Sequence, residues 1–600
     1  MIGTYSDEAI AEALAERKQK PPAVKTRKTQ GDPGYIYAMR IERSIESSGS
    51  YPFAVAFFDG VKFRHFWGRK CLTQAKEFLW ECEPGLIYFH RGDARDFQII
   101  FDWFEGRITF SRDMAILGGE MLANRGTHRI VDSVTLFDHA LDRYRSFYRG
   151  DAPAAIEDAQ RGPEREQHRR SILLRMKWEC GAIWKTIAEF RAEYGPHCTL
   201  GAAAIDQVKA RHWFAHLSRE DDREIRPYYK GGMNRVFAEG FGVFTGDFKL
   251  YDVNSMYAYI MRSYLHPIGH QGIPTETITP ATCFLIVREP GRQCFTTTIH
   301  EYKMGLRLKL WKSGLEIVQC HNFPDQGTFA EFVEDFHSRR LAAMNRGDEL
   351  RADLANDILR AASGKFAQNP NHYFEYKIQS MNAMPLSLPA DVRDCFDCHE
   401  GVCFEHWTRL HKYPEWNKEV WRRNRSSNYV LNVATAASIT GAARSIEMRA
   451  SAGAIRPMYC DTDSLICESI REHIDPRELG AWKLESRGHT LAIASLKHYA
   501  LFGDQCPTCK RSRSETGTCD DEHFHRWGCV KLVCAGAYEN PAEILAAARG
   551  ERELRQPDEY THTIEQLDRA LVHRYTLDES GELSIETGLR GDDDEYKGEF

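Results

Sequence analysis

The chain has 600 residues, of which 42% are hydrophobic, 28% charged and 12% aromatic, and its formal net charge is −7. This ordinary globular composition excludes a collagen-like, coiled-coil or wholly disordered chain, and the net negative charge means that any nucleic-acid surface must be local. The sequence contains no run of ~18 uncharged apolar residues, so it predicts no membrane span. We also see no apolar signal core at the N-terminus. We therefore expect a cytoplasmic protein with reduced cysteines.

The first third of the chain predicts a tail followed by a mixed domain. Residues 1–34 carry a Pro-containing basic run, which is typical of a solvated tail. Residues 35–217 alternate short apolar runs with polar turns, which predicts an α/β domain with a strand over Phe53–Phe58 and a helix over Leu173–Tyr194. The charged, Pro-marked connection Ser218–Pro227 then predicts a domain boundary.

A second α/β block follows, and its first notable segment ends in a carboxylate. The apolar run Phe248–Val253 predicts a strand that ends at Asp252, and Asn254 or Ser255 can cap a following helix. A carboxylate at the end of a strand can project into a cleft, although a capping motif explains this segment equally well by itself.

The next segment is a helix predicted over Leu350–Asn369, with an apolar stripe and three cations, Arg351, Arg360 and Lys365. Cations beside a carboxylate pair suit a phosphate-bearing substrate. Considered alone, the segment is also explained by a solvated amphipathic helix.

The third segment, Met458–Cys467, predicts a β-hairpin with Asp461 and Asp463 at its tip. Asp and Ser are common turn residues, but two like charges at one bend repel unless a cation lies between them. A small-residue helix over Leu431–Met448 is predicted to pack beneath this hairpin.

Together the three segments predict one chemistry. Carboxylates on separate segments, Asp252 and Asp463, can hold two divalent ions, which lie about 3.5–4 Å apart in two-metal sites. One ion activates an attacking 3′-hydroxyl, the other neutralises the leaving pyrophosphate, and the cationic helix binds the triphosphate. The sequence therefore predicts nucleotidyl transfer with two Mg²⁺ or Mn²⁺ ions.

These segments resemble the motifs of family B DNA polymerases, in the order found in the protein-primed polymerases of phages and linear plasmids. Asp252–Tyr257 looks like motif A, Ser363–Phe366 with its preceding helix looks like a degenerate motif B, and Tyr459–Ser464 matches motif C. Tyr229–Gly232 resembles the YxGG template-binding loop, and Lys497–Tyr499 resembles the KxY motif that holds the primer end.

The resemblance implies an α/β multidomain fold, in which a ribonuclease-H-like, exonuclease-type N-terminal domain precedes a right-hand polymerase of palm, fingers and thumb. The implied division is a basic tail at 1–34, an inactive exonuclease-like domain at 35–217, palm with motif A at 218–327, fingers with motif B at 328–370, a Cys-containing insertion at 371–430, palm with motif C and KxY at 431–500, and a thumb-like region with a Cys cluster and an acidic tail at 501–600.

The resemblance also implies roles for single residues. Asp252 and Asp463 are the expected metal ligands, together with the Val253 carbonyl, and Asp461 is a secondary catalytic acid. Tyr257 is expected under the incoming sugar, where it excludes a 2′-hydroxyl. The expected nucleotide-binding residues are Val253, Tyr257, Arg351, Arg360 and Lys365, and the expected DNA-binding residues are Tyr229, Gly231, Gly232, Lys497 and Tyr499.

Motif B departs from the family pattern. The family usually has Lys, Asn and Tyr where this chain has Asn356, Arg360 and Ser363. We therefore expect polymerase chemistry with an altered nucleotide grip or reduced fidelity, and Arg351 or Arg360 can replace the missing Lys.

The exonuclease-like domain departs further. Arg40 stands where the first motif has a metal-binding Asp and Glu42 follows it, and Arg91 stands where the second motif has Asn, with Asp96 fitting only after a one-residue shift. The third motif reads Met176 to Cys180 with Glu179 adjacent, so one or two of the domain's metal-binding carboxylates remain. A cation in place of a metal ligand repels the ion, so we expect a retained but inactive proofreading domain.

The sequence Asp132–Leu136 still resembles the single-strand and terminal-protein contact motif of the family, which makes Ser133 an expected DNA-binding residue. The domain is thus expected to retain binding although it has lost exonuclease activity.

Cysteine spacing predicts a structural zinc ion. Cys506 and Cys509 form a CxxC pair, and Cys519 and Cys529 follow it, which is a ligand set for tetrahedral zinc. Unpaired surface thiols are the alternative. For the second cluster, at 395–406, we favour no metal.

The leading prediction is a template-directed DNA polymerase that acts as a monomer on primer-template DNA and dNTPs, with a terminal protein as an alternative primer. We expect it in the cytoplasm of a bacterial host, phage- or plasmid-encoded and associated with the nucleoid. One alternative is a template-independent or lesion-tolerant nucleotidyltransferase, and another is a non-catalytic DNA-binding protein on a polymerase scaffold.

Overall fold

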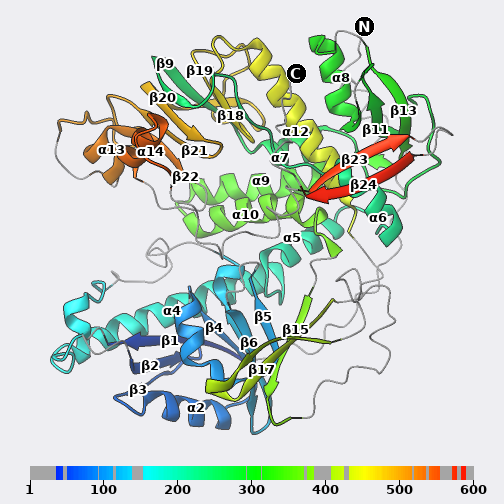
Figure 1. Ribbon diagram of the computed structural model, residues 1–600. Coiled ribbons are helices and arrows are strands. Elements are labelled where there is room, and N and C mark those ends of the chain that lie inside the picture. The colour runs from blue at the N-terminus through cyan, green and yellow to red at the C-terminus, as the bar shows by residue number, and fades with distance from the viewer. Residues whose placement is uncertain are drawn as a thin grey trace. The chain divides into compact units, whose positions relative to one another are not determined.

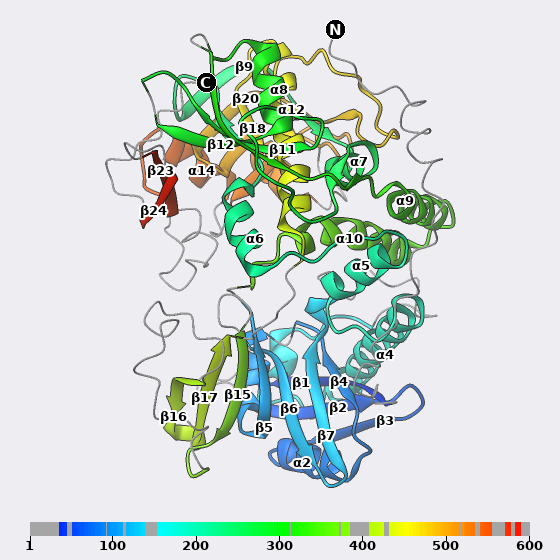
Figure 2. The same ribbon diagram turned by 90° about the vertical axis from the view of Figure 1, so that its right-hand side faces the viewer.

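The protein is described from a computed structural model, drawn in Figures 1 and 2. The tail at 1–34, the cysteine cluster at 395–406 and the acidic tail at 592–599 lie outside the described residues. Within the described part, no helix combines the length and the apolar character needed to cross a lipid bilayer. The structure describes residues 35–44, 51–91, 93–111, 116–137, 153–291, 293–311, 314–370, 374–383, 407–424, 431–515, 519, 521–534, 540–554, 571–577 and 583–589.

The N-terminal half is built on a ten-stranded sheet that several helices accompany (Figure 1). In sheet order the strands are β16 (Thr408–Tyr413), β17 (Lys418–Asn424), β15 (Phe374–Ser380), β5 (Phe104–Phe110), β6 (Ile116–Ala123), β7 (Gly126–Asp132), β4 (Leu86–Phe89), β1 (Ile36–Arg43), β2 (Pro52–Phe58) and β3 (Phe63–Trp67). The helices are α2 (Cys71–Glu81), α3 (Asp93–Ile99) and α4 (Arg169–Tyr194).

Strand β2 of this sheet is buried on both faces. In β2, Ala54 and Ala56 belong to the apolar cluster that includes α4, whereas Val55 and Phe57 belong to the cluster that includes α2. A strand covered on both faces is a continuous apolar run rather than an alternating one. The strand predicted over 53–58 and the helix predicted over 173–194 are both confirmed.

The described part of the interval 371–430, expected to be a separate insertion, extends the N-terminal sheet (Figure 2). Strand β15 pairs antiparallel with β5, with Tyr376 opposite Ile108. Ile378 is buried in the same apolar cluster as Ile108. Backbone hydrogen bonds therefore join this interval to the exonuclease-like domain.

The second half is built on a seven-stranded sheet with α12 (Val433–Gly453) and α7 (Met256–Ser263) nearby. The helix predicted over 431–448 corresponds to α12. In sheet order the strands are β22 (Cys529–Cys534), β21 (His498–Phe502), β20 (Trp482–Ser495), β9 (Gly242–Val253), β19 (Ser464–Cys467), β18 (Tyr459–Asp461) and β8 (Asn234–Val236).

Small residues let α12 pack closely in the interior. A Cβ atom at Gly441 would lie 2.3 Å from the hydroxyl of Thr298, which caps the helix α8 (Ile299–Leu308). Only glycine permits this approach, because real Cβ contacts are never so short.

The region after residue 500, expected to be thumb-like, is divided between two sheets. Strand β22 continues the palm sheet, so the palm extends beyond the predicted boundary. The hairpin of β23 (Leu571–Leu577) and β24 (Leu583–Leu589) pairs instead with β12 (Cys294–Thr298). The strand order of this second sheet is β13 (Glu316–Asn322), β11 (Thr282–Arg288), β12, β23 and β24.

Two neighbouring helices, α9 (Ala330–Asn345) and α10 (Glu349–Phe366), occupy the expected fingers, and α10 is the helix predicted over 350–369. Asp348 caps α10 by accepting from the amide of Arg351 at 3.2 Å. The remaining elements used below are α5 (Leu200–Lys209), α6 (Arg219–Ile225), α13 (Glu522–Trp527) and α14 (Pro541–Ala548).

Candidate active site

Two carboxylates meet where β9 ends and the β18–β19 hairpin turns. Asp252, near the end of β9, pairs with Ser464 of β19. The amide of Val253 donates to the backbone carbonyl of Asp463 at 2.8 Å, and Asp461 pairs with Ser464 across the hairpin. The predicted strand and hairpin are confirmed, and the structure makes them neighbours.

The negative charge of this site is only partly balanced. Burial, followed by the charge of Asp252, raises the pKa of Asp463 to about 6 although Arg360 opposes the shift. Burial also raises the pKa of Asp252, and Lys483 opposes that shift. Because buried like charges repel unless a cation intervenes, these carboxylates fit a site for divalent cations, with the Val253 carbonyl as a further oxygen.

A third acid, Glu447 of α12, lies in the interior near the same site. Its side chain is fully buried, and neither carboxylate oxygen has a hydrogen-bond partner among the described residues. Burial, followed by the charges of Asp463 and Asp252, raises the pKa of Glu447 well above its usual value. No motif marks this position, and sequence analysis missed it.

Two lysines approach the acids. The Nζ atom of Lys483 lies 2.7 Å from Asp252 Oδ2, and that of Lys497 lies 3.7 Å from Asp461 Oδ1. A lysine ammonium sits on a flexible stem, so it can move aside when another cation binds the carboxylate. Sequence analysis identified Lys497 from the KxY motif and missed Lys483.

Tyr499, the second residue of the KxY pair, is buried rather than presented to solvent. Its ring packs 4.9 Å from that of Tyr459, and the amide of Lys497 donates to the Tyr459 hydroxyl at 2.8 Å. The ring therefore supports the acidic hairpin from behind, while Lys497 faces the acids.

Of the three cations expected at the nucleotide site, Arg360 is brought to the carboxylates. Its charge lowers the pKa of Asp463. A second guanidinium, from Arg340 of α9, donates to the Ser255 hydroxyl at 3.3 Å. Burial, followed by the charge of Arg360, lowers the pKa of Arg340. Two like-charged groups beside the acids fit a polyanionic ligand, and sequence analysis missed Arg340.

The other two cations of α10 lie elsewhere, contrary to expectation. Arg351 pairs with Asp348 at 3.0 Å and with Glu189 of α4 at 3.4 Å. The stem of Lys365 packs against Gly201 of α5. Arg351 and Arg360 are nine positions apart, which places them about 180° apart around an α-helix.

Tyr257 of α7 faces the acidic site. Burial, followed by the charges of Asp463 and Tyr229, raises the pKa of Tyr257 to about 12. The ring therefore lies near both the catalytic carboxylates and the expected template loop, as the motif A resemblance implies.

The YxGG loop lies against the acidic hairpin. A Cβ atom at Gly232 would lie 2.6 Å from the Thr462 side chain, so glycine is required for this approach. The Thr462 amide donates to the Met233 carbonyl at 2.8 Å, whereas Gly231 is exposed with no neighbour within 4 Å of a built Cβ. One glycine permits packing and the other leaves the backbone open.

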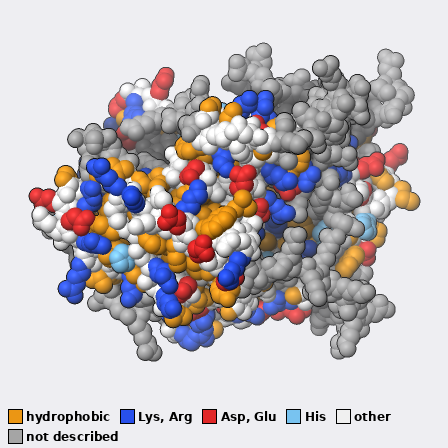
Figure 3. Space-filling model, turned by 90° about the horizontal axis from the view of Figure 1, so that it is seen from below, with side chains coloured by type: hydrophobic (Ala, Val, Ile, Leu, Met, Phe, Trp, Pro, Cys, Tyr) orange, Lys and Arg blue, Asp and Glu red, His pale blue; other side chains and the backbone are white. Residues whose placement is uncertain are grey.

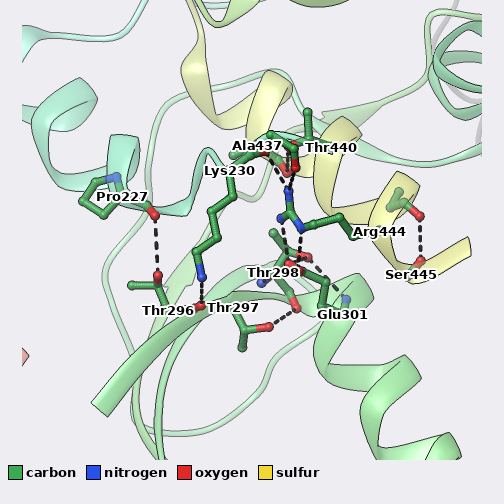
Figure 4. A network of polar contacts seen from close by, with 12 residues as sticks. Pro227, Lys230, Thr296, Thr297, Thr298, Glu301, Ala437, Thr440, Arg444 and Ser445 are labelled. Atoms are coloured by element: carbon green, nitrogen blue, oxygen red, sulfur yellow. Dashed lines mark hydrogen bonds and ion pairs between the residues drawn. The ribbon is translucent and has the colours of Figure 1, made fainter. Parts of the chain in front are cut away.

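A buried arginine holds this loop in place, as Figure 4 shows. Arg444 of α12 donates from Nη1 to the carbonyls of Lys230 and Gly231, at 2.7 and 2.8 Å. The same guanidinium pairs with Glu301 of α8, at 2.6 Å, and Lys230 Nζ donates to the Thr296 carbonyl at 2.6 Å. Sequence analysis identified the loop but not Arg444 or Glu301.

The acids of the exonuclease-like domain are paired with arginines. Glu179 contacts Arg40 at 2.9 Å and Arg175 at 2.8 Å. Glu42 contacts Arg161 at 3.2 Å. The third acid, Asp96, lies 3.5 Å from Arg43, and all three carboxylates are buried.

Ser133, expected to contact DNA, is fully buried, and its hydroxyl lies 2.9 Å from His90 Nδ1. A buried serine cannot contact DNA directly in this conformation. On the face seen in Figure 3, the described basic, acidic and apolar side chains are interspersed, without one dominant sign of charge.

Comparisons with known proteins agree with this geometry. Residues 179–282 match the family model described as DNA polymerase type B, organellar and viral. The DNA-directed DNA polymerase of Enterobacteria phage PRD1 is 33% identical over 477 residues, which cover 76% of this chain and 80% of that protein. A probable DNA polymerase of Agaricus bitorquis is 24% identical over 44% of this chain and 38% of its own length.

Solved structures show the same fold. Phi29 DNA polymerase complexed with primer-template DNA and incoming nucleotide matches with a TM-score of 0.63 at 14% identity, covering 93% of this chain and 100% of that one. The same enzyme complexed with single-stranded DNA matches with a TM-score of 0.59 at 16% identity, covering 84% and 92%. The chain therefore belongs to the family B DNA polymerases, as a DNA-directed DNA polymerase of the phage PRD1 and phi29 protein-primed type.

Proposed function

We propose that this polymerase extends a primer by a two-metal mechanism at Asp252 and Asp463. The observation that carries the proposal is the adjacency of two half-buried carboxylates whose charge the chain balances only in part. Bound Mg²⁺ or Mn²⁺ ions supply Lewis-acid activation of the 3′-hydroxyl and neutralise the leaving pyrophosphate. Asp252, Asp463 and the Val253 carbonyl would hold these ions, and Asp461 keeps Lys497 beside the primer end.

The chain's own cations position the nucleotide. Arg360 and Arg340 bind the triphosphate, because both lie beside the acids and repel each other in its absence. Tyr257 excludes a 2′-hydroxyl at the sugar. Arg351 is given no part in nucleotide binding, since it pairs with Glu189 of α4, and the stem of Lys365 packs against Gly201 of α5.

The template backbone runs past the YxGG loop. Gly231 leaves the loop open to close approach, and Arg444 fixes the carbonyls of Lys230 and Gly231. The loop also packs on Thr462 of the acidic hairpin, so template position and metal position are mechanically linked.

The exonuclease-like domain does not proofread. Its three remaining acids each contact an arginine, and a guanidinium occupies the charge-compensating role that a metal ion has in an active nuclease. Mg²⁺-dependent trimming of a 3′ overhang by wild type, lost in Asp96→Ala, would overturn this assignment.

The phi29 enzyme has been solved with primer-template DNA and nucleotide, and we extend these partners to this chain. A terminal protein that offers a hydroxyl as primer is the matching partner of the protein-primed type. We place the enzyme, as a monomer, on DNA in the host cytoplasm and nucleoid. A template-independent or lesion-tolerant transferase is a second candidate, favoured by the altered motif B, where Ser363 lies beside Arg360.

Primer extension tests these proposals. Wild type, Asp252→Ala and Asp463→Ala are compared with and without template, and Asp504→Ala serves as the control because that aspartate is 90% exposed. Wild type and the control should extend only templated primers, and the two site variants should not. Extension of a single strand without template would support the second candidate, and binding without incorporation by wild type would support a non-catalytic scaffold.

A further inference from the structure

The loop between β21 and β22 gathers three cysteine side chains. The sulfur atoms of Cys506, Cys509 and Cys519 all lie within 4.8 Å of one another, and those of Cys506 and Cys519 are 3.3 Å apart. All three are free thiols. Sulfur atoms that share a tetrahedral zinc ion at about 2.3 Å lie about 3.8 Å from each other, so the observed spacing requires only small adjustments.

The backbone around the CxxC pair forms a tight knuckle. The Cys506 amide donates to the Arg511 carbonyl at 2.8 Å, and the Lys510 amide donates to the Cys506 carbonyl at 3.0 Å. Lys510 has a φ of +61°, which turns the chain back on itself. Both Cys506 and Cys509 therefore project to the same side.

Backbone amides surround one of the three sulfur atoms. The amides of Thr508 and Cys509 bond to the sulfur of Cys506. This arrangement suits a thiolate, which is the form of cysteine that binds metal.

We propose that Cys506, Cys509 and Cys519 hold one structural zinc ion. Three thiolates select zinc among the common divalent ions, and the fourth position takes a non-sulfur ligand. Cys529, which the spacing had added to the set, does not belong to it. It is the first residue of β22, and its sulfur lies 3.1 Å from the Lys531 carbonyl.

The position of the site indicates a structural role for the metal. Cys506 is fully buried in the apolar cluster that also contains Tyr459 and Tyr499, while Cys509 and Cys519 pack against its edge. Tyr459 precedes the catalytic hairpin, and Tyr499 supports it. A metal here would hold the loop against the face of the palm sheet behind the acidic site, and its loss would loosen β21, which directly follows Lys497.

The metal content of the full-length protein tests the proposal. The chain is expressed in zinc-supplemented medium and purified without chelator. Its zinc content is then measured by elemental mass spectrometry. We expect one zinc per chain in wild type and in Cys529→Ser, and none in Cys509→Ser. Chelation should lower the thermal unfolding midpoint of wild type and leave that of Cys509→Ser unchanged.

Cobalt substitution keeps the test independent of variant folding. Wild type that is stripped of metal and reloaded with Co²⁺ should show sulfur-to-cobalt charge-transfer absorption, which Zn²⁺ removes. Absence of both zinc and this absorption in wild type, zinc retained by a folded Cys509→Ser, or a Cys506–Cys519 disulfide in freshly purified protein would each overturn the proposal.

Discussion

The exonuclease-like domain and the palm both gather buried acids beside β-strands, yet they neutralise them differently. In the first, Glu42, Asp96 and Glu179 each contact an arginine of the same chain. In the palm, Asp252 lies 2.7 Å from the Nζ atom of the flexible Lys483. Burial and the charge of Asp252 raise the pKa of Asp463 to about 6, although Arg360 opposes the shift. On the proposed function, the comparison indicates that acidic residues alone do not define a metal site, because the cations that the chain supplies must be counted with them.

The arginines of the N-terminal domain and the lysines of the palm also differ in how firmly they stay with their carboxylates. Burial opposes the charge of Arg40, but Glu179 and Glu42 raise its pKa above the usual value, so this guanidinium stays charged at every pH the fold survives. A lysine on a flexible stem can leave its carboxylate. The N-terminal acids are thus held in ion pairs with arginines, whereas the palm acids can exchange a lysine for another cation.

The largest expected effect is the loss of nucleotide incorporation when an acid of the palm cluster is neutralised. Asp463→Asn keeps the shape of the hairpin but removes one metal-binding charge, so single-turnover incorporation should fall at least about a thousand-fold, or ~4 kcal/mol. Asp504→Asn, at an exposed position of the same half of the molecule, should match wild type. A loss below tenfold for Asp463→Asn would break the assignment of the palm site.

The next prediction concerns stability in the N-terminal domain. Glu179→Gln leaves Arg40 and Arg175 without their carboxylate in the interior, which should cost about 3 kcal/mol in urea unfolding. The matched control is Glu316→Gln, which removes the partner of Arg288 in an exposed pair and should have no measurable effect. Equal unfolding midpoints for both variants would show that the arginine network is dispensable.

Neutralising an acid in the palm should raise the free energy of unfolding, whereas Glu179→Gln should lower it. Because the pKa of Asp463 is raised in the folded state, this group stabilises the metal-free protein fully below about pH 4, and that contribution is lost as the pH rises through about 6. Asp463→Asn should thus be more stable than metal-free wild type at pH 8, by about 2 kcal/mol, and equal to it near pH 4. Urea unfolding in EDTA measures both, and a difference independent of pH would contradict the shifted pKa.

The fourth prediction contrasts two arginines on one helix. Arg360→Gln should raise KM for dNTP about tenfold, or ~1.4 kcal/mol, because it removes a charge next to the acids. Arg351→Gln should leave KM unchanged, since Arg351 pairs with acids at the other face of α10. Steady-state kinetics on a primed template measure both, and similar KM values for the two variants would refute the helix geometry.

The smallest expected effect concerns the template loop. Arg444→Met removes both bonds to the loop carbonyls, so template affinity should fall about fivefold, or ~1 kcal/mol, while binding of dNTP changes less. Arg449→Met on the same helix, which breaks a pair with Glu472, is the control. Fluorescence anisotropy of a labelled primer-template measures the difference, and an equal loss in both variants would assign it to the helix as a whole.

Local patterns predicted the parts of the fold that depend on neighbouring residues. The hairpin with Asp461 and Asp463 follows from an acidic turn between apolar runs, and the strand before Asp252 follows from its apolar residues. Joining of β15 to β5 was not predictable in this way, because it pairs residues more than 260 positions apart and leaves no local signal.

The site was predictable only where a motif marks it. Arg340, Glu447 and Lys483 reach the site from segments without a recognised pattern, and only their placement in space reveals them. Arg351 was wrongly grouped with Arg360 because proximity along the chain was taken for proximity on the helix surface.

The pairing of β15 with β5 has a consequence for how the molecule holds together. The polypeptide leaves the N-terminal sheet, builds the motif A part of the palm, returns to add three strands to the first sheet, and leaves again for motif C. A protease cut within residues 218–227 would therefore break the chain without releasing the first domain. The antiparallel pairing of β15 with β5 would still join the two fragments by backbone hydrogen bonds.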